Sequence, residues 1–313
     1  MTAAIPDPSR SLADEPAKRS PLPYLALALG ALAMGISPTF VRIADVGPIA
    51  SAFWRVGAAV PVLWVWAMIE ARNQGEPIGA TFRIDKAILI AGLVFAGDLL
   101  FWHLSIVNTT VANATLLSTM APVWVVIGSG LFIAEKVGGN VVSGLTLCVI
   151  GAAALIGTSF SLSPDRLLGD VYGIATSIFF GAYFLAVRSA RRNAGPGRIV
   201  FLTALITAAV ILVFALLLED RILPRSAAGA AALIGLALIS HAGGQGLLIY
   251  ALGHLPAAFS SLVIFIEAPA AAVFAWVFLA EPVSAFQAAG GALILAGIYV
   301  ARPRLPPLRA DRP

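Results

Sequence analysis

Ten apolar runs follow one another through this chain of 313 residues, and each is about as long as a bilayer is thick. A membrane helix needs roughly 20 apolar residues, because the hydrocarbon core spans about 30 Å. Charged residues make up only 12% of the sequence, whereas a soluble domain carries about 25%. The runs lack the strict alternation of membrane β-strands. We therefore predict an all-α integral membrane protein.

Several connections between the runs are very short, so we expect neighbouring helices to form hairpins. The predicted helices cover residues 23–43, 48–69, 87–106, 109–133, 140–158, 169–189, 198–218, 228–250, 256–279 and 284–301.

The basic residues lie at the ends of these helices. If the N-terminus is cytoplasmic, fifteen of the 20 Lys and Arg residues fall on the cytoplasmic side and five on the other. Loops rich in Lys and Arg stay in the cytoplasm. We therefore predict a protein of a bacterial-type inner membrane with both termini cytoplasmic. The net charge of +4 follows the topology and forms no basic face, so we expect no nucleic-acid partner.

Four features recur in order at an offset of 146 or 147 residues. A glycine that opens the segment and a Val-Arg pair that closes it occur at 35–42 and again at 181–188. Glycine-spaced helices occur at 144–151 and 290–297. The glutamates Glu135 and Glu281 and the mid-helix prolines Pro122 and Pro269 complete the series. The chain therefore reads as two repeats.

Each repeat holds five helices, and because five is odd, the second copy must enter the membrane from the opposite side. Inverted repeats of this kind are typical of secondary transporters, whose halves rock about a shared site near the midplane. We predict a first repeat at 23–158 and a second at 169–301, joined by a linker at 159–168. A disordered tail at 1–22 and a second tail at 302–313 would lie in the cytoplasm.

The same segments resemble the EamA-type, ten-helix branch of the drug/metabolite transporter superfamily. The resemblance rests on "VANATLLSTMAPVWVVIGSGLFIAEKV" and "LPAAFSSLVIFIEAPAAAVFAWVFLAEPV", each with a central proline and a closing glutamate, and on "FWR" at 53–55. It implies a metabolite carrier, often an exporter of amino acids or other small polar compounds. Glu267 departs from the pattern, which has a small or amide residue before the proline.

Asp98 lies about halfway along the third helix. An ionised side chain at the bilayer centre costs about 2.5–3.5 kcal/mol on insertion scales. Such a carboxylate either lines a wet cavity or joins helices by hydrogen bonds. Trp102 follows one helical turn later, and the two side chains would together suit a polar or cationic solute.

The other cavity candidates are polar residues in apolar helices. Gln245 takes the position of Asp98 in the second repeat, with His241 one turn before it, and Glu267 is a further cavity candidate that could carry protons. Arg55 either attracts an anionic group or pairs with a carboxylate such as Asp45. The remaining cavity candidate is Tyr250.

The recurring residues have a different expected role. Glu135 and Glu281 lie near opposite membrane faces, which favours helix capping or gating over substrate binding. Pro122 and Pro269 each remove a backbone hydrogen bond, so they would bend their helices symmetrically.

The function that these patterns favour is a secondary transporter for a small polar metabolite, amino acid or drug. We expect an exporter that works by alternating access and uses a proton gradient through Asp98 or Glu267. A membrane scaffold or sensor and an intramembrane enzyme are the alternatives. The sequence has no paired-histidine metal motif, nucleophile elbow or phosphate-binding lysine loop, so we predict no enzyme, metal site or cofactor. Partners are the solute and the bilayer, and both a monomer and a homodimer remain open.

Overall fold

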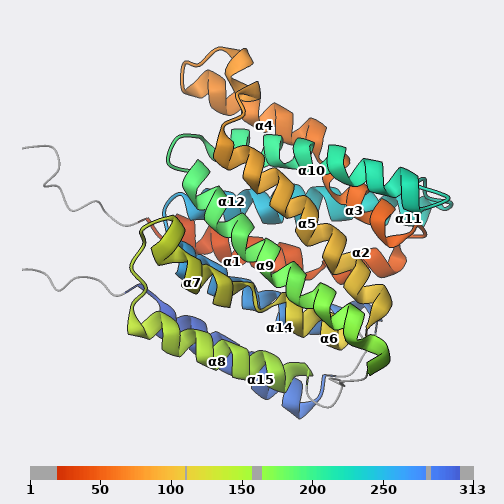
Figure 1. Cartoon of the computed structure of the whole chain (residues 1–313), viewed down its shortest axis with the longest axis vertical. Helices are drawn as coiled ribbons and strands as arrows, with labels where there is room; N and C mark the ends of the chain where they lie inside the picture. The colour runs from red at the N-terminus through yellow and green to blue at the C-terminus, as the bar shows by residue number, and fades with distance from the viewer. Residues whose placement is uncertain (1–19, 110, 157–163, 280–282, 304–313) are drawn as a thin grey trace, which may run out of the picture.

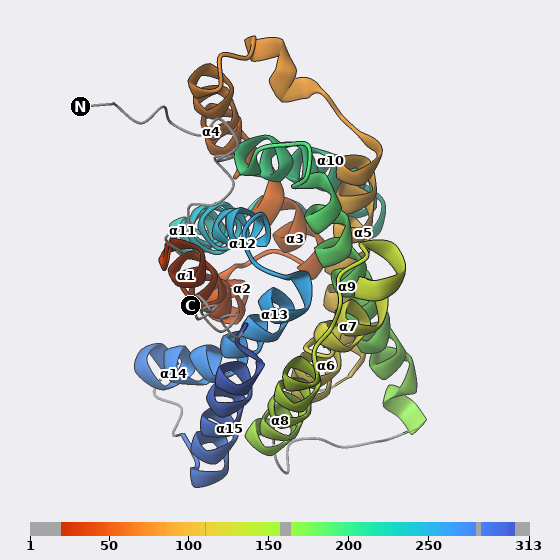
Figure 2. The ribbon, with the colours of Figure 1, turned by 90° about the vertical axis from the view of Figure 1, so that its left-hand side faces the viewer.

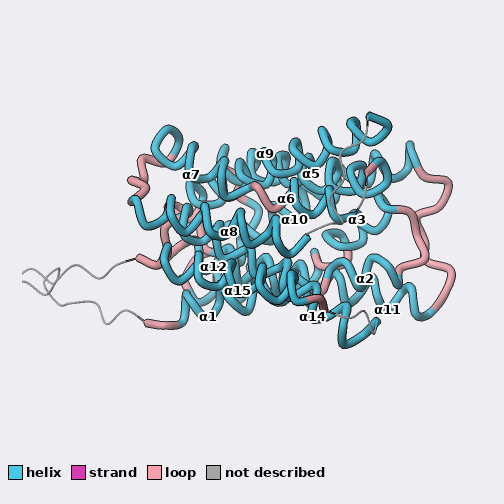
Figure 3. The backbone as a smooth tube through the Cα atoms, turned by 90° about the horizontal axis from the view of Figure 1, so that it is seen from below, coloured by secondary structure: helices cyan, strands magenta, loops and turns pink. Residues whose placement is uncertain are grey.

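The computed structural model describes residues 20–109, 111–156, 164–279 and 283–303, and these form helices and short connections without any strand (Figure 3). Eight of the helices are long and apolar enough to cross a membrane, and two shorter apolar helices accompany them. The prediction of an all-α membrane protein with ten helices is confirmed. Several of these ten are broken into two or three segments.

The first half of the chain contains five membrane helices, of which three are broken. In chain order its segments are α1 (Leu22–Gly35), α2 (Ser37–Ile43), α3 (Pro48–Gly57), α4 (Val60–Asn73), η1 (Ile78–Phe82), α5 (Lys86–Asn108), α6 (Val111–Ser118), α7 (Ala121–Phe132) and α8 (Gly139–Ile156).

The second half repeats this order. Its segments are η3 (Pro164–Arg166), α9 (Leu167–Ala190), α10 (Pro196–Leu218), α11 (Ala227–Gly235), η4 (Leu236–Gln245), α12 (Gly246–Leu252), α13 (Ala257–Val263), η5 (Ile264–Ile266), α14 (Glu267–Leu279) and α15 (Ala285–Ala301). Here η4 is a π-helical segment, and η5 is a short 3₁₀ turn.

The two halves interleave. Helix α5 of the first half packs along α9, which begins the second half, while α1 packs against η4 and α12. Helix α10 packs on both α3 and α4. Figure 1 shows α5 and α9 running side by side through the middle of the molecule. Because helices of one half pack against helices of the other, the two halves share one core.

Helices α8 and α15 form a pair at the edge of the molecule (Figure 2). The recurring glycines make this pair close. A Cβ on Gly144 would lie 2.5 Å from the carbonyl oxygen of Gly297, and one on Gly151 would lie 2.7 Å from that of Gly290. Small residues let membrane helices approach until their backbones touch, which favours van der Waals packing.

Two glutamates cap helices of the opposite half. Glu219, after α10, accepts hydrogen bonds from the backbone N–H groups of Ile49 (2.6 Å) and Ala50 (3.0 Å) at the start of α3. Glu70, in α4, accepts them from Gly197 (3.2 Å) and Arg198 (3.0 Å) at the start of α10. A carboxylate at a helix N-terminus satisfies free N–H groups and opposes the helix dipole.

A Gly-Pro pair opens each of these capped helices, at residues 47–48 and 195–196. A Cβ on Gly47 would collide with the carboxylate of Glu219, and one on Gly195 with that of Glu70. Proline at the first helical position loses no bond, because its missing N–H would have no partner there. The two caps are therefore a repeated feature, which the sequence analysis missed.

Candidate functional site

A cavity of about 120 Å³ lies between the two halves. Elements of both halves line it. Its wall consists of Met34, Gly35, Ser37, Pro38, Arg55, Asp98, Leu99, Trp102, Thr115, Ser118, Thr119, Ala121, Pro122, Thr176, Phe180, Phe184, Gln245, Ser261, Ile264, Glu267 and Ala268. A cavity of similar size (~150 Å³) in another protein admits a benzene-sized ligand.

The wall is built largely where helices are interrupted. Helices α1 and α2 meet at Ile36, and α6 and α7 are separated at residues 119–120, just before Pro122. In the second half, η5 precedes Pro269 at the corresponding place, and η4 replaces an α-helix by a π-helix. Proline cannot donate a backbone hydrogen bond, and π-helical turns often mark functional sites. The breaks turn side chains of different helices toward one space.

Three ionisable side chains reach this cavity: Arg55 from α3, Asp98 from α5 and Glu267 from α14. Asp98 is only 7% exposed. The three lie within electrostatic range of one another, yet no ion pair joins them in the described part of the chain. The Nε of Arg55 and the Oε1 of Glu267 are buried without a hydrogen-bond partner. The three ionisable groups therefore face the cavity without a contact ion pair between them.

Asp45 does not pair with Arg55. Its Oδ2 accepts hydrogen bonds from the backbone N–H groups of Arg225 (3.0 Å) and Ser226 (2.7 Å), just before α11. Arg55 lines the cavity instead, together with the carboxyl groups of Asp98 and Glu267.

The rest of the wall combines hydroxyl groups with aromatic and aliphatic surface. Trp102 lies one turn beyond Asp98 on α5, and Gln245 contributes an amide whose Oε1 is buried without a partner. The hydroxyl groups come from Ser37, Thr115, Ser118, Thr119, Thr176 and Ser261. Such a wall can bind a solute that carries both charge and apolar surface.

His241 and Tyr250 do not line the cavity. His241 is 1% exposed and stacks on Phe95 at 5.7 Å between ring centroids, and neither of its ring nitrogens has a partner. Tyr250, on α12, lies against His254 at 4.7 Å. His241 and Gln245 both lie in the π-helical segment η4, and of the two only Gln245 lines the cavity.

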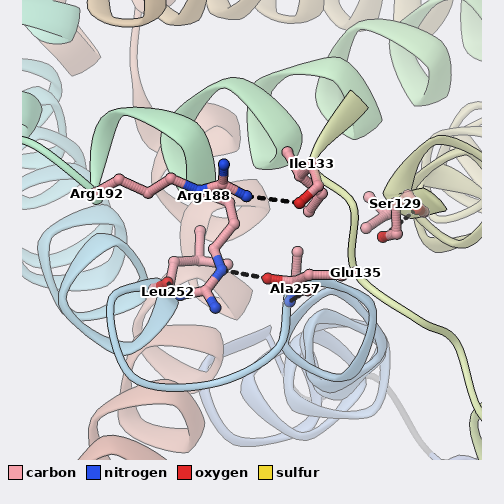
Figure 4. Close-up of polar contacts among 8 residues, drawn as sticks. Ser129, Ile133, Glu135, Arg188, Arg192, Leu252 and Ala257 are labelled. Atoms are coloured by element: carbon pink, nitrogen blue, oxygen red, sulfur yellow. Dashed lines mark hydrogen bonds and ion pairs between the residues drawn. The ribbon is translucent and has the colours of Figure 1, made fainter. Parts of the chain in front are cut away.

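Glu135 accepts hydrogen bonds from two other elements (Figure 4). Its Oε1 accepts from the Nε of Arg188 at 2.5 Å, and its Oε2 accepts from the backbone N–H of Ala257 at 2.9 Å. Arg188 also donates to the carbonyl oxygen of Leu252 at 2.6 Å. We call these four residues the Glu135 cluster. It joins the segment after α7, the end of α9 and the start of α13, and these three helices also line the cavity.

The other recurring residues have separate places. Pro122 lines the cavity, whereas Pro269 packs beside Gly291 of α15. Glu281, the repeat partner of Glu135, lies outside the described residues.

Asp170 shows how an aspartate that joins helices is bound. It is 6% exposed, and its Oδ1 accepts from the hydroxyl of Thr109 (2.7 Å) and the amide of Asn113 (3.0 Å). No comparable bond holds Asp98 among the described residues. Asp170 was not among the predicted residues, because its position near a predicted helix end gave no reason to select it.

Comparisons with known proteins agree with this architecture. The profile of the "EamA-like transporter family" matches residues 21–157 and again residues 167–302. A pseudopaline exporter, CntI of Pseudomonas aeruginosa, is 26% identical over 229 residues, which are 73% of this chain and 76% of the exporter. An uncharacterized transporter of Archaeoglobus fulgidus is 26% identical over 278 residues, 88% of this chain and 94% of its own.

A solved crystal structure of a protein covers 90% of this chain and 94% of its own, with a TM-score of 0.72 and 18% sequence identity. At that identity the similarity concerns the fold alone.

Proposed function

The chain belongs to the EamA-like transporter family, and from this premise we propose that it exports a small polar metabolite, amino acid or drug by alternating access through the cavity. The unpaired charges of Arg55, Asp98 and Glu267 carry this proposal. Each costs about 2.5–3.5 kcal/mol within the bilayer on insertion scales. A stable membrane helix retains such groups when a solute uses them.

A relative supports the proposed direction of transport. The Pseudomonas aeruginosa protein that is 26% identical to this chain is an exporter. We extend this direction to the present chain, and we assign proton coupling to Asp98 or Glu267. A carboxylate in the cavity can hold a proton while the solute is absent and release it when a cationic group approaches.

A growth-protection screen tests the export of a solute. Cells that express the wild type, Asp98→Asn or an empty vector are exposed to toxic amino acids, their analogues and drugs. We expect the wild type to protect against at least one compound. Asp98→Asn should reach the membrane in the same amount and protect at least tenfold less. Protection by Asp98→Asn equal to that of the wild type at every pH would remove Asp98 from the mechanism.

Flux into proteoliposomes tests the coupling. With the protected compound as substrate, an imposed pH gradient should drive accumulation by the wild type. Asp98→Asn or Glu267→Gln should transport without response to the gradient. Accumulation by the wild type that ignores the gradient would refute proton coupling while leaving transport itself intact.

A further inference from the structure

The cavity has an unbalanced set of charges. Among the described residues that line it, only Arg55, Asp98 and Glu267 are ionisable, so two carboxylates face one guanidinium. With all three ionised, the wall carries one net negative charge. The carboxylates come from α5 and α14, which belong to different halves of the chain.

Three further titratable side chains, His103, Tyr183 and His241, lie behind this wall. His103 donates the N–H at Nδ1 to the carbonyl oxygen of Leu99, 2.6 Å away. His241 lies within the stack with Phe95, and Tyr183 lies on the other face of the same ring at 4.6 Å. Both histidines are at most 2% exposed, and none of these three side chains lines the cavity. The charge excess therefore faces the cavity itself.

A charge removed from water is stable only when an opposite charge or hydrogen bonds compensate it. Arg55 can compensate one carboxylate, or it can be shared by a carboxylate of the solute. In either arrangement, complete neutralisation requires one further positive charge from the occupant. Trp102, one turn from Asp98, adds an aromatic surface of the kind that attracts ammonium and guanidinium groups.

We propose that this cavity selects solutes that carry one more cationic group than anionic groups, such as α-amino acids with a second, side-chain amine. The carboxylate of the solute binds Arg55, and its two ammonium groups bind Asp98 and Glu267. This inference rests on the proposed function, because it names the substrate class of the same site. A solute without the second amine leaves one buried carboxylate uncompensated.

Binding to the purified protein tests this selection without any flux. The fluorescence of Trp102, which lines the cavity, reports occupancy. L-lysine and L-norleucine share one carbon skeleton and differ in the side-chain amine, and L-glutamate supplies the opposite charge. We expect L-lysine to bind at least tenfold more tightly than L-norleucine, and L-glutamate to bind most weakly.

A substitution that balances the wall should change this order. In Glu267→Gln the three charges become two of opposite sign, so the preference for L-lysine over L-norleucine should fall to threefold or less. Glu76→Gln is the matched control, because Glu76 is an exposed carboxylate away from the cavity. This control should keep the wild-type ratio.

The outcomes separate the two proposals. Equal or tighter binding of L-norleucine by the wild type overturns the charge selection, as does a ratio that Glu267→Gln leaves unchanged. The absence of binding by all three amino acids also overturns it. Tight L-lysine binding without L-lysine flux in proteoliposomes supports the selection and contradicts transport. Flux of neutral amino acids at the rate of L-lysine supports transport and contradicts the selection.

Discussion

Asp98 and Asp170 are both buried aspartates of membrane helices, and the difference between them lies in what each carboxylate contacts. Asp170 joins α9 to the start of the neighbouring helix through Thr109 and Asn113. Asp98 faces a cavity that it shares with Arg55 and Glu267. Burial alone does not distinguish a residue that stabilises the fold from one available to a solute.

The two aspartates should respond oppositely to replacement by asparagine. Asp170→Asn weakens two bonds that involve a charged acceptor, each worth about 1.5–3 kcal/mol, so the melting temperature in detergent should fall by several degrees. Asp98→Asn removes a poorly compensated charge, so its melting temperature should equal or exceed that of the wild type. A larger loss in Asp98→Asn than in Asp170→Asn would show that Asp98 stabilises the fold.

The sequence predicts single residues of this cavity only where they contrast with their surroundings. Asp98, Glu267 and Arg55 are charges in apolar helices, and the structure places them at one cavity. The wall also contains hydroxyl groups such as Thr115, which have no such contrast because serine and threonine are common in membrane helices. His241 was predicted for the cavity but stacks on Phe95 instead, a contact between distant helices that hydrophobic periodicity does not reveal.

The paired helices α8 and α15 depend on close backbone contact, so a single added methyl group at their glycines should matter. Gly290→Ala places a Cβ 2.5 Å from the carbonyl oxygen of Gly151, whereas Gly130 of α7 has open space around it. In an open helical position, alanine stabilises the helix by about 0.5–1 kcal/mol relative to glycine. The melting temperature should therefore fall for Gly290→Ala and should not fall for Gly130→Ala. Equal melting temperatures would show that the two helices separate at little cost.

The Glu135 cluster joins three elements through one carboxylate, and the side chains of Arg188 and Glu135 are 25% and 18% exposed. A double-mutant cycle with Glu135→Gln and Arg188→Met should therefore give a coupling energy of about 1 kcal/mol, since partial solvent contact weakens the pair. The measurement is the free energy of unfolding in mixed detergent. Strictly additive effects would show that the two side chains act independently.

The same cluster bears on access to the cavity. Since it holds the ends of α7, α9 and α13 together, Glu135→Gln should raise the rate at which a thiol reagent reaches a cysteine introduced at Ser261, a cavity residue. The buried native Cys148 is first replaced by alanine. An unchanged labelling rate would limit the cluster to a structural role.

The whole molecule consists of two five-helix halves, and hydropathy together with the repeat predicted this much. The break at Ile36 was not located, because hydropathy is continuous across it, whereas Pro122 marked the helix that is interrupted just before it. The exchange of neighbours between the halves was also not predicted. Pairing between distant helices depends on side-chain fit, which a single sequence does not display.

The topology of the whole chain allows a direct check. Helix α1 begins and α15 ends at the same end of the molecule (Figure 3). Reporters fused after Arg312 and inserted after Arg83 should both be cytoplasmic in the inner membrane, while one inserted after Arg221 should be periplasmic. A periplasmic signal at Arg312 would contradict the predicted orientation.

The two glutamate caps have a consequence for how the chain is made. Helix α3 is synthesised about 170 residues before Glu219, the residue that caps it. During translation, α3 is therefore made before the carboxylate that caps its first turn. Glu70 precedes α10 in the chain and is already present when α10 is made, whereas Glu219 is made only after both α3 and α10. The first turn of a helix in the first half is thus completed only by a residue from the second half.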